Sequence, residues 1–176
     1  MMAADFEDYG HCVDFGDIIK YLHQAGADLN IRDNKGDTAV MMAAEKGHED
    51  IVKYLHQAGA DVNIKNDEGW TAFTKASYEG HLDIVMYLHH AGADINIKTK
   101  NGDTAMMLAA YCRGSFRPSK GHEDTVKYLH QAGADINITN NDGDSALMLA
   151  DKKFQEDIVK YLQEAGAKFP LEEQID

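Results

Sequence analysis

A unit of 33 residues that repeats along the chain restricts its fold more than any other feature of the sequence. The string Gln-Ala-Gly-Ala-Asp and its variants recur at intervals of 33, 33, 41 and 33 residues, so one unit carries eight additional residues. The glycines of this string are Gly26, Gly59, Gly92, Gly133 and Gly166. A second glycine series has the same spacing, at Gly36, Gly69, Gly102 and Gly143. Such a period is typical of a solenoid, in which each unit buries its apolar face against its neighbours.

Each unit is predicted to fold as a pair of antiparallel helices. A first apolar stretch begins after Thr38, a candidate N-cap, and ends before Gly47, which suits the left-handed position that closes a helix. A second stretch has the apolar spacing of one helical face, at Ile51, Val52, Tyr54, Leu55 and Ala58. Segment 61–69 is rich in Asn, Asp and Gly, and it predicts an exposed turn to the next pair.

These residues resemble the ankyrin repeat over about residues 13–168. The resemblance rests on Asp33-Asn-Lys-Gly-Asp-Thr-Ala, Ala43-Ala44, Gly47-His48, Ile51-Val52 and Gly59-Ala-Asp-Val-Asn63 and their counterparts. It implies an all-α ankyrin-repeat solenoid of stacked antiparallel helix pairs with β-turn or hairpin-like connections. It also implies that partner proteins bind to the turn tips and the first helix of each pair. The family's Thr-Pro-Leu-His is replaced here by sequences such as Thr71-Ala-Phe-Thr74, so the helix starts lose the pre-organisation that proline gives.

The spacing predicts one domain, 1–176, without a linker. Its expected parts are a truncated first repeat at 1–32, repeats at 33–65, 66–98 and 99–139, a capping repeat at 140–168 and a tail at 169–176. The eight-residue insertion, 112–119, falls between the two helices of the 99–139 repeat. In the last repeat Asp151 replaces an alanine and Phe154 replaces a glycine, which we interpret as marks of a terminal cap.

The composition disfavours several classes of partner and location. With 17 basic and 30 acidic residues the formal charge is −13, which disfavours nucleic acid and anionic membrane surfaces as partners. No apolar run approaches the roughly 20 residues of a membrane span, and the first residues lack the features of a secretory signal. The two cysteines, Cys12 and Cys112, do not form a disulfide framework. We expect an intracellular, cytoplasmic monomer.

Residues that recur from unit to unit are interpreted as structural. Four histidines form a ladder along the second helices, and neighbouring helices lie too far apart for two rungs to share a zinc ion. They are His23, His56, His89 and His130. The Gly-His elements contain His48, His81 and His122, which we expect to make structural hydrogen bonds. A tyrosine series and a methionine series are expected to pack in the core: Tyr21, Tyr54, Tyr87, Tyr128 and Tyr161, and Met41, Met42, Met106, Met107 and Met148. We expect no metal, no cofactor and no catalytic residue.

Residues that break the repeat are the functional candidates, because a residue that the fold requires recurs from unit to unit. Trp70 replaces an aspartate, and a tryptophan at an exposed position is typical of a binding hot spot. The insertion places positive charge and an aromatic residue in a loop, which in repeat proteins often lies on the binding side. The predicted partner-binding site comprises Trp70, Tyr78, Tyr111, Arg113, Phe116, Arg117 and Lys120. Its cationic insertion favours a protein or peptide partner with acidic and aromatic features.

Several alternatives stay open at this stage. The aromatic residues can instead shield neighbouring turns, and the insertion can be a tolerated loop extension. The chain can be a scaffold module whose insertion docks into another copy. As an enzyme, the chain could pair Cys112 with His122 or use Ser115 as a nucleophile, but the sequence contains no supporting catalytic motif. The family resemblance also suggests hydroxylation of the repeat asparagines Asn63, Asn96 and Asn137.

Overall fold

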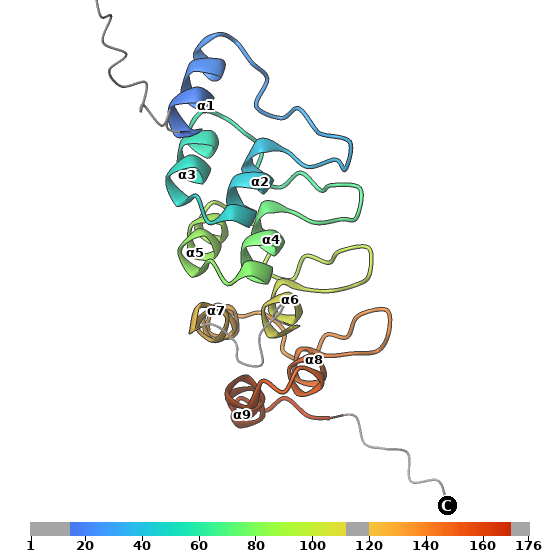
Figure 1. Cartoon of the computed structure of the whole chain (residues 1–176). Coiled ribbons are helices and arrows are strands. Elements are labelled where there is room, and N and C mark those ends of the chain that lie inside the picture. The colour runs from blue at the N-terminus through green and yellow to red at the C-terminus, as the bar shows by residue number, and fades with distance from the viewer. Residues whose placement is uncertain (1–14, 112–119, 170–176) are drawn as a thin grey trace, which may run out of the picture.

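The computed structural model describes residues 15–111 and 120–169 of the chain, and within these residues the regular elements are helices (Figure 1). They are α1 (Phe15–Gln24), α2 (Ala39–Lys46), α3 (Glu49–Gln57), α4 (Ala72–Glu79), α5 (Leu82–His90), α6 (Ala105–Tyr111), α7 (Lys120–Gln131), α8 (Ala146–Lys152) and α9 (Glu156–Glu164). In one layer α2, α4, α6 and α8 stack on one another, and α3, α5, α7 and α9 form a second layer beside it. This stack of helix pairs confirms the predicted all-α solenoid. No described helix is long and apolar enough to cross a membrane.

Long turns connect the pairs and project from the same side of the stack (Figure 1). Neighbouring turns are joined by backbone hydrogen bonds, such as the one from the Asp67 N–H to the Lys35 carbonyl oxygen at 3.1 Å. The Lys100 N–H donates to the Glu68 carbonyl oxygen in the same way, at 2.9 Å. Two of these connections also contain an isolated antiparallel bridge, Lys98 with Thr104 and Thr139 with Ser145. The hairpin-like connections that the resemblance implied are therefore present.

Small residues allow the helices of the first layer to approach one another closely. The buried alanines of this layer are Ala43, Ala44, Ala72, Ala76, Ala105, Ala109, Ala110, Ala146 and Ala150. Larger aliphatic side chains fill the space between the layers, and most come from the second helix of each pair, such as Val52, Leu55, Val85 and Leu88. Each unit thus contributes one small and one bulky face, and stacking buries both.

The helix boundaries follow the predicted capping residues with two exceptions. The side chains of Thr71 and Ser145 accept hydrogen bonds from backbone N–H groups in the first turns of α4 and α8. Thr38 precedes α2 as predicted, but its buried hydroxyl makes no hydrogen bond. Gly47 closes α2 in the predicted left-handed conformation, with φ 76°. Gly121, its counterpart in sequence, lies inside α7 instead, because that helix begins at Lys120.

The first end of the described stack leaves apolar side chains exposed, contrary to two sequence predictions. Tyr21 was predicted to pack in the core, but it is 71% exposed on α1, beside the exposed Ile18 and Leu22. Met42 was also predicted to be buried and is 46% exposed on α2, the first helix of its layer. Both corrections have the same cause: within the described residues, no preceding helix pair covers this end. Met41, Met106 and Met107 are buried as predicted.

Phe154 holds the only positive φ of any described residue other than glycine, at 56°. Its side chain is 75% exposed, so packing does not offset the strain of this conformation. Phe154→Gly is expected to raise the free energy of unfolding by about 1 kcal/mol, because glycine adopts a positive φ without a Cβ clash. Phe154→Ala serves as the control, since it removes the ring but keeps the Cβ. Urea unfolding of both variants checks this, and an equal gain from alanine would show that the exposed ring is responsible.

Candidate functional site

Trp70 is held at the start of α4 by the turn that precedes it. The Asn66 N–H donates to the Trp70 carbonyl oxygen, and the Trp70 N–H donates to the Asn66 side-chain oxygen, both at 2.8 Å. The next residue, Thr71, forms a reciprocal capping box with Thr74, which fixes the first turn of α4. The backbone of Trp70 is therefore well ordered before any partner binds.

Trp70 and Tyr78 form one aromatic pair along α4. Their ring centroids are 5.4 Å apart, and their planes meet edge to face at 78°. Both side chains are half-buried, so the prediction that Trp70 is an exposed residue was wrong. The Tyr78 ring covers part of the indole, and the remaining ring surface of the pair lines two hollows on the first layer of helices.

The first of these, called here the acidic hollow, has a volume of about 430 Å³. Its lining comprises Asn34, Lys35, Asp37, Glu45, Asn66, Asp67, Glu68, Trp70, Lys75, Tyr78 and Glu79. Five carboxylates therefore face two ammonium groups. Because like charges share this small volume, the potential inside it is negative and attracts cations.

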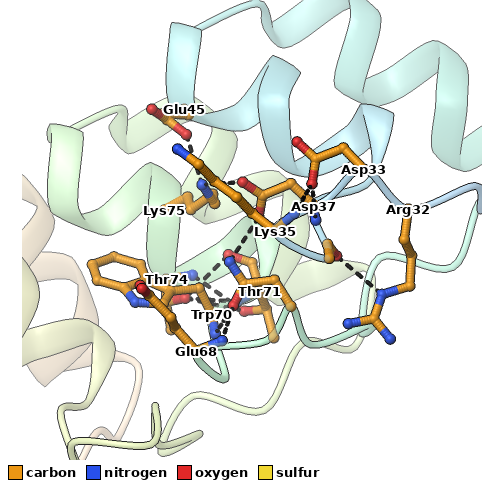
Figure 2. Close-up of polar contacts among 12 residues, drawn as sticks. Arg32, Asp33, Lys35, Asp37, Glu45, Glu68, Trp70, Thr71, Thr74 and Lys75 are labelled. Atoms are coloured by element: carbon orange, nitrogen blue, oxygen red, sulfur yellow. Dashed lines mark hydrogen bonds and ion pairs between the residues drawn. The ribbon is translucent and has the colours of Figure 1, made fainter.

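Lys75 forms ion pairs with two of these carboxylates (Figure 2). Its ammonium group donates to Glu45 at 2.7 Å and to Asp37 at 3.0 Å, and Asn66 donates to the other oxygen of Asp37 at 2.7 Å. Burial by itself lowers the pKa of Lys75, but the hydrogen bonds that its ammonium group donates to Glu45 and Asp37 outweigh this effect, so the pKa lies above its ordinary value. Lys75 is thus a protonated structural cation.

Asp33, in the turn beside the acidic hollow, keeps its negative charge through hydrogen bonds from the backbone. The Asp33 carboxylate accepts hydrogen bonds from the backbone N–H groups of Asp37 and Lys35, both at 2.8 Å (Figure 2). These two bonds lower the pKa of Asp33. The turn that borders the acidic hollow therefore stays negatively charged.

The second hollow, called here the aromatic hollow, has a volume of about 520 Å³. Its lining comprises Trp70, Tyr78, Asn101, Asp103, Met107, Leu108, Tyr111, Asn140, Asp142, Asp144, Leu149 and Lys152. Two of its carboxylates already have partners, since Asp103 accepts from Asn140 at 2.7 Å and Asp144 pairs with Lys152 at 2.6 Å. Tyr111 lies at the end of α6 and is 37% exposed, with the Lys153 ammonium 4.1 Å from its ring centroid.

The structure brings together three of the predicted site residues. Trp70, Tyr78 and Tyr111 all line the aromatic hollow. Lys120 is exposed at the start of α7 and lines neither hollow. The remaining predicted residues, Arg113, Phe116 and Arg117, lie outside the described residues, as do Cys112 and Ser115 of the enzyme alternative.

Lys75 is not among the predicted site residues, although a break in the repeat, which identified Trp70, also marks this position. Lys75 stands where the other units have Met42, Leu108 and Leu149, so it also breaks the repeat. The two leucines at this position line the aromatic hollow. A comparison of all positions on the first helices would therefore have identified Lys75 as a candidate.

The histidine ladder has a structural role, and its partner is the tyrosine series. Each ladder histidine bonds through Nδ1 to the tyrosine hydroxyl of the next unit, at 2.7 to 2.9 Å. The pairs are His23 with Tyr54, His56 with Tyr87, His89 with Tyr128, and His130 with Tyr161. His81 and His122 bond instead to backbone carbonyl groups of the preceding unit, those of Glu45 and Tyr78. No group of three or more metal-ligating side chains occurs within 15–111 and 120–169.

Comparison with protein families identifies one matching model. A model described as ankyrin repeats in three copies matches residues 2–99, 58–117 and 87–172, which together span most of the chain. A search of curated proteins finds no match.

Proposed function

Because the chain belongs to the ankyrin-repeat family, whose members are generally protein–protein interaction modules, we propose that it binds a partner across the two hollows. The proposed module is non-catalytic and comprises one ankyrin-repeat domain, 1–176. Its partner is a protein or peptide, and the centre of its binding site is formed by Trp70, Tyr78 and Tyr111.

The Trp70–Tyr78 pair is the observation that carries this proposal. Other units place Asp37, Asp103 and Asp144 where Trp70 stands, so the fold does not require an aromatic residue there. The pair is fixed by the capped start of α4 and by its edge-to-face contact. Aromatic side chains that are ordered before binding lose little entropy, which makes them efficient interface anchors.

The inserted segment 112–119 extends this proposal beyond the hollows. It follows Tyr111 directly in the sequence, and Tyr111 lines the aromatic hollow. We propose that Arg113, Phe116 and Arg117, together with Lys120, form an outer part of the same binding surface.

Affinity capture from the native host tests the proposed function. Trp70→Ala is expected to reduce capture of the partner at least about tenfold, because the aromatic anchor is lost. Met86→Ala is the matched control, since Met86 is a 37% exposed apolar residue on α5 that lines neither hollow. Circular dichroism verifies that both variants fold. Undiminished capture by folded Trp70→Ala would contradict the proposed site, and a variant lacking 112–119 tests the outer surface separately.

A further inference from the structure

We infer, building on the proposed function, that the two hollows recognise an extended partner segment with a basic side chain and an apolar side chain about four to six positions apart. The basic side chain occupies the acidic hollow and the apolar one occupies the aromatic hollow. The Trp70–Tyr78 pair, which lines both hollows, contacts the segment between them.

The charges of the acidic hollow determine which charge the bound side chain of the partner carries. Lys75 pairs with Asp37 and Glu45, whereas Glu68 and Glu79 have no ion pair among the described residues. An arginine or lysine of the partner donates hydrogen bonds to these carboxylates and is attracted by the adjacent indole and phenol rings. An acidic side chain would meet repulsion in the same place.

The aromatic hollow favours an apolar side chain by a different argument. Of its three carboxylates, Asp144 forms an ion pair with Lys152 and Asp103 accepts a hydrogen bond from the Asn140 amide, so among the described residues Asp142 alone has no side-chain partner. The lining also contains aliphatic side chains and the partly exposed ring of Tyr111. A leucine-like side chain there would remove apolar surface from water at about 25 cal/mol per Å².

The spacing follows from the repeat. The acidic hollow is lined by the units at 33–65 and 66–98, whereas the aromatic hollow is lined by the units at 66–98, 99–139 and 140–168. Packed helices are about 8 to 10 Å apart, so the middles of the hollows, about one and a half to two units apart, are separated by about 12 to 20 Å. An extended chain in the polyproline II conformation advances about 3.1 Å per residue, so about four to six residues span this distance.

This partner differs from the acidic one that the inserted sequence favoured. That expectation rested on Arg113 and Arg117, which lie outside the described residues, and on Lys120, which lines neither hollow. Among the described residues, the charged side chains that line the hollows around the Trp70–Tyr78 pair are predominantly acidic.

Peptide libraries of defined composition test the inference on the full chain. One library carries an arginine and, about four to six positions later, a leucine in a background of Gly, Ser and Ala. A second replaces the arginine with glutamate, and a third replaces the leucine with serine. Immobilised protein is expected to retain the first library at least about tenfold better than the second, and several-fold better than the third. A raised salt concentration should weaken only the contribution of the arginine to the binding of the library.

The variant Glu68→Gln/Glu79→Gln keeps the size of the two side chains and removes their charge. Its retention of the arginine library should be lower than that of the wild type by about the same factor. Equal retention of the glutamate library, or unchanged binding by the double variant, would overturn the inference. The proposed function is judged separately by capture of the native partner. If that capture depends on Trp70 but not on Glu68 and Glu79, the proposed function stands and the basic–apolar inference fails.

Discussion

Gly69→Ala is expected to lower the free energy of unfolding by about 2 to 4 kcal/mol, whereas the equivalent Gly143→Ala should lower it by only about 1 kcal/mol. Both glycines occupy the same turn position in their units, and both have a φ of 81°. The backbone strain of an alanine is therefore the same at the two sites. Only the surroundings of the new methyl group differ.

The difference arises because Gly69 is covered by the next unit. A Cβ at Gly69 would lie 2.8 Å from the backbone nitrogen of Lys100, whose N–H donates to the Glu68 carbonyl oxygen. At Gly143 no atom lies within 4 Å of the added Cβ. Alanine at Gly69 must therefore displace the stacked turn and lose an inter-unit hydrogen bond, which adds to the strain.

Urea unfolding of the two variants measures this difference. A solenoid is stabilised by contacts between neighbouring units, so Gly69→Ala is also expected to broaden the transition as the halves of the stack lose coupling. Similar losses from the two alanines would contradict the proposed importance of the stacked turns. Because Gly69 precedes Trp70, the same variant should weaken partner capture.

The repeat predicted the fold well because each recurring residue meets a local requirement that is the same in every unit. The glycine spacing located the turns, and the apolar spacing located the helices. The predictions were wrong where the surroundings of one unit differ from those of the others. Gly121 follows the insertion and lies within α7, and Tyr21 lies at the end of the described stack. Neither circumstance follows from the residue itself.

The candidate site was only partly predictable for a related reason. The break in the repeat identified Trp70, Tyr78 and Tyr111, and the structure places all three around one hollow. The partial burial of Trp70 and Tyr78 was not predictable, because it depends on the edge-to-face contact between their rings. The net charge of the acidic hollow depends on side chains from two successive units, including Lys75, which local sequence patterns do not bring together.

Replacing Lys75 with leucine, the residue at this position in two other units, is expected to lower the free energy of unfolding by about 1 to 3 kcal/mol. The side chains of Lys75 and Asp37 are 13% and 9% exposed, so the change leaves a largely buried carboxylate without its cation. The Asn66 amide still donates to Asp37, which limits the loss. Adding Asp37→Asn should recover most of the stability, because it removes the uncompensated charge.

Lys152→Leu is the matched control for Lys75→Leu. Lys152 also pairs with an aspartate, Asp144 at 2.6 Å, whose side chain is 10% exposed and so about as buried as that of Asp37, but the Lys152 side chain itself is 58% exposed. Solvent screens such a pair, so its removal should change the stability by less than about 1 kcal/mol. Chemical denaturation of the single and double variants provides the comparison. Equal losses from the two lysine variants would mean that burial does not strengthen the Lys75 pair.

The dependence on pH supplies an independent test of the same pair. Folding raises the pKa of Lys75 above its ordinary value of 10.5, so its contribution is complete below that pH and is lost as the pH rises through the folded-state value. The stability difference between the wild type and Lys75→Leu should therefore stay constant from neutral pH to about pH 9 and shrink above pH 10.5. Referring each measurement to the variant cancels the ionisation of the tyrosines, which both proteins share. A difference that grows at high pH would require that the folded state favours the neutral amine, contrary to the contacts with Asp37 and Glu45.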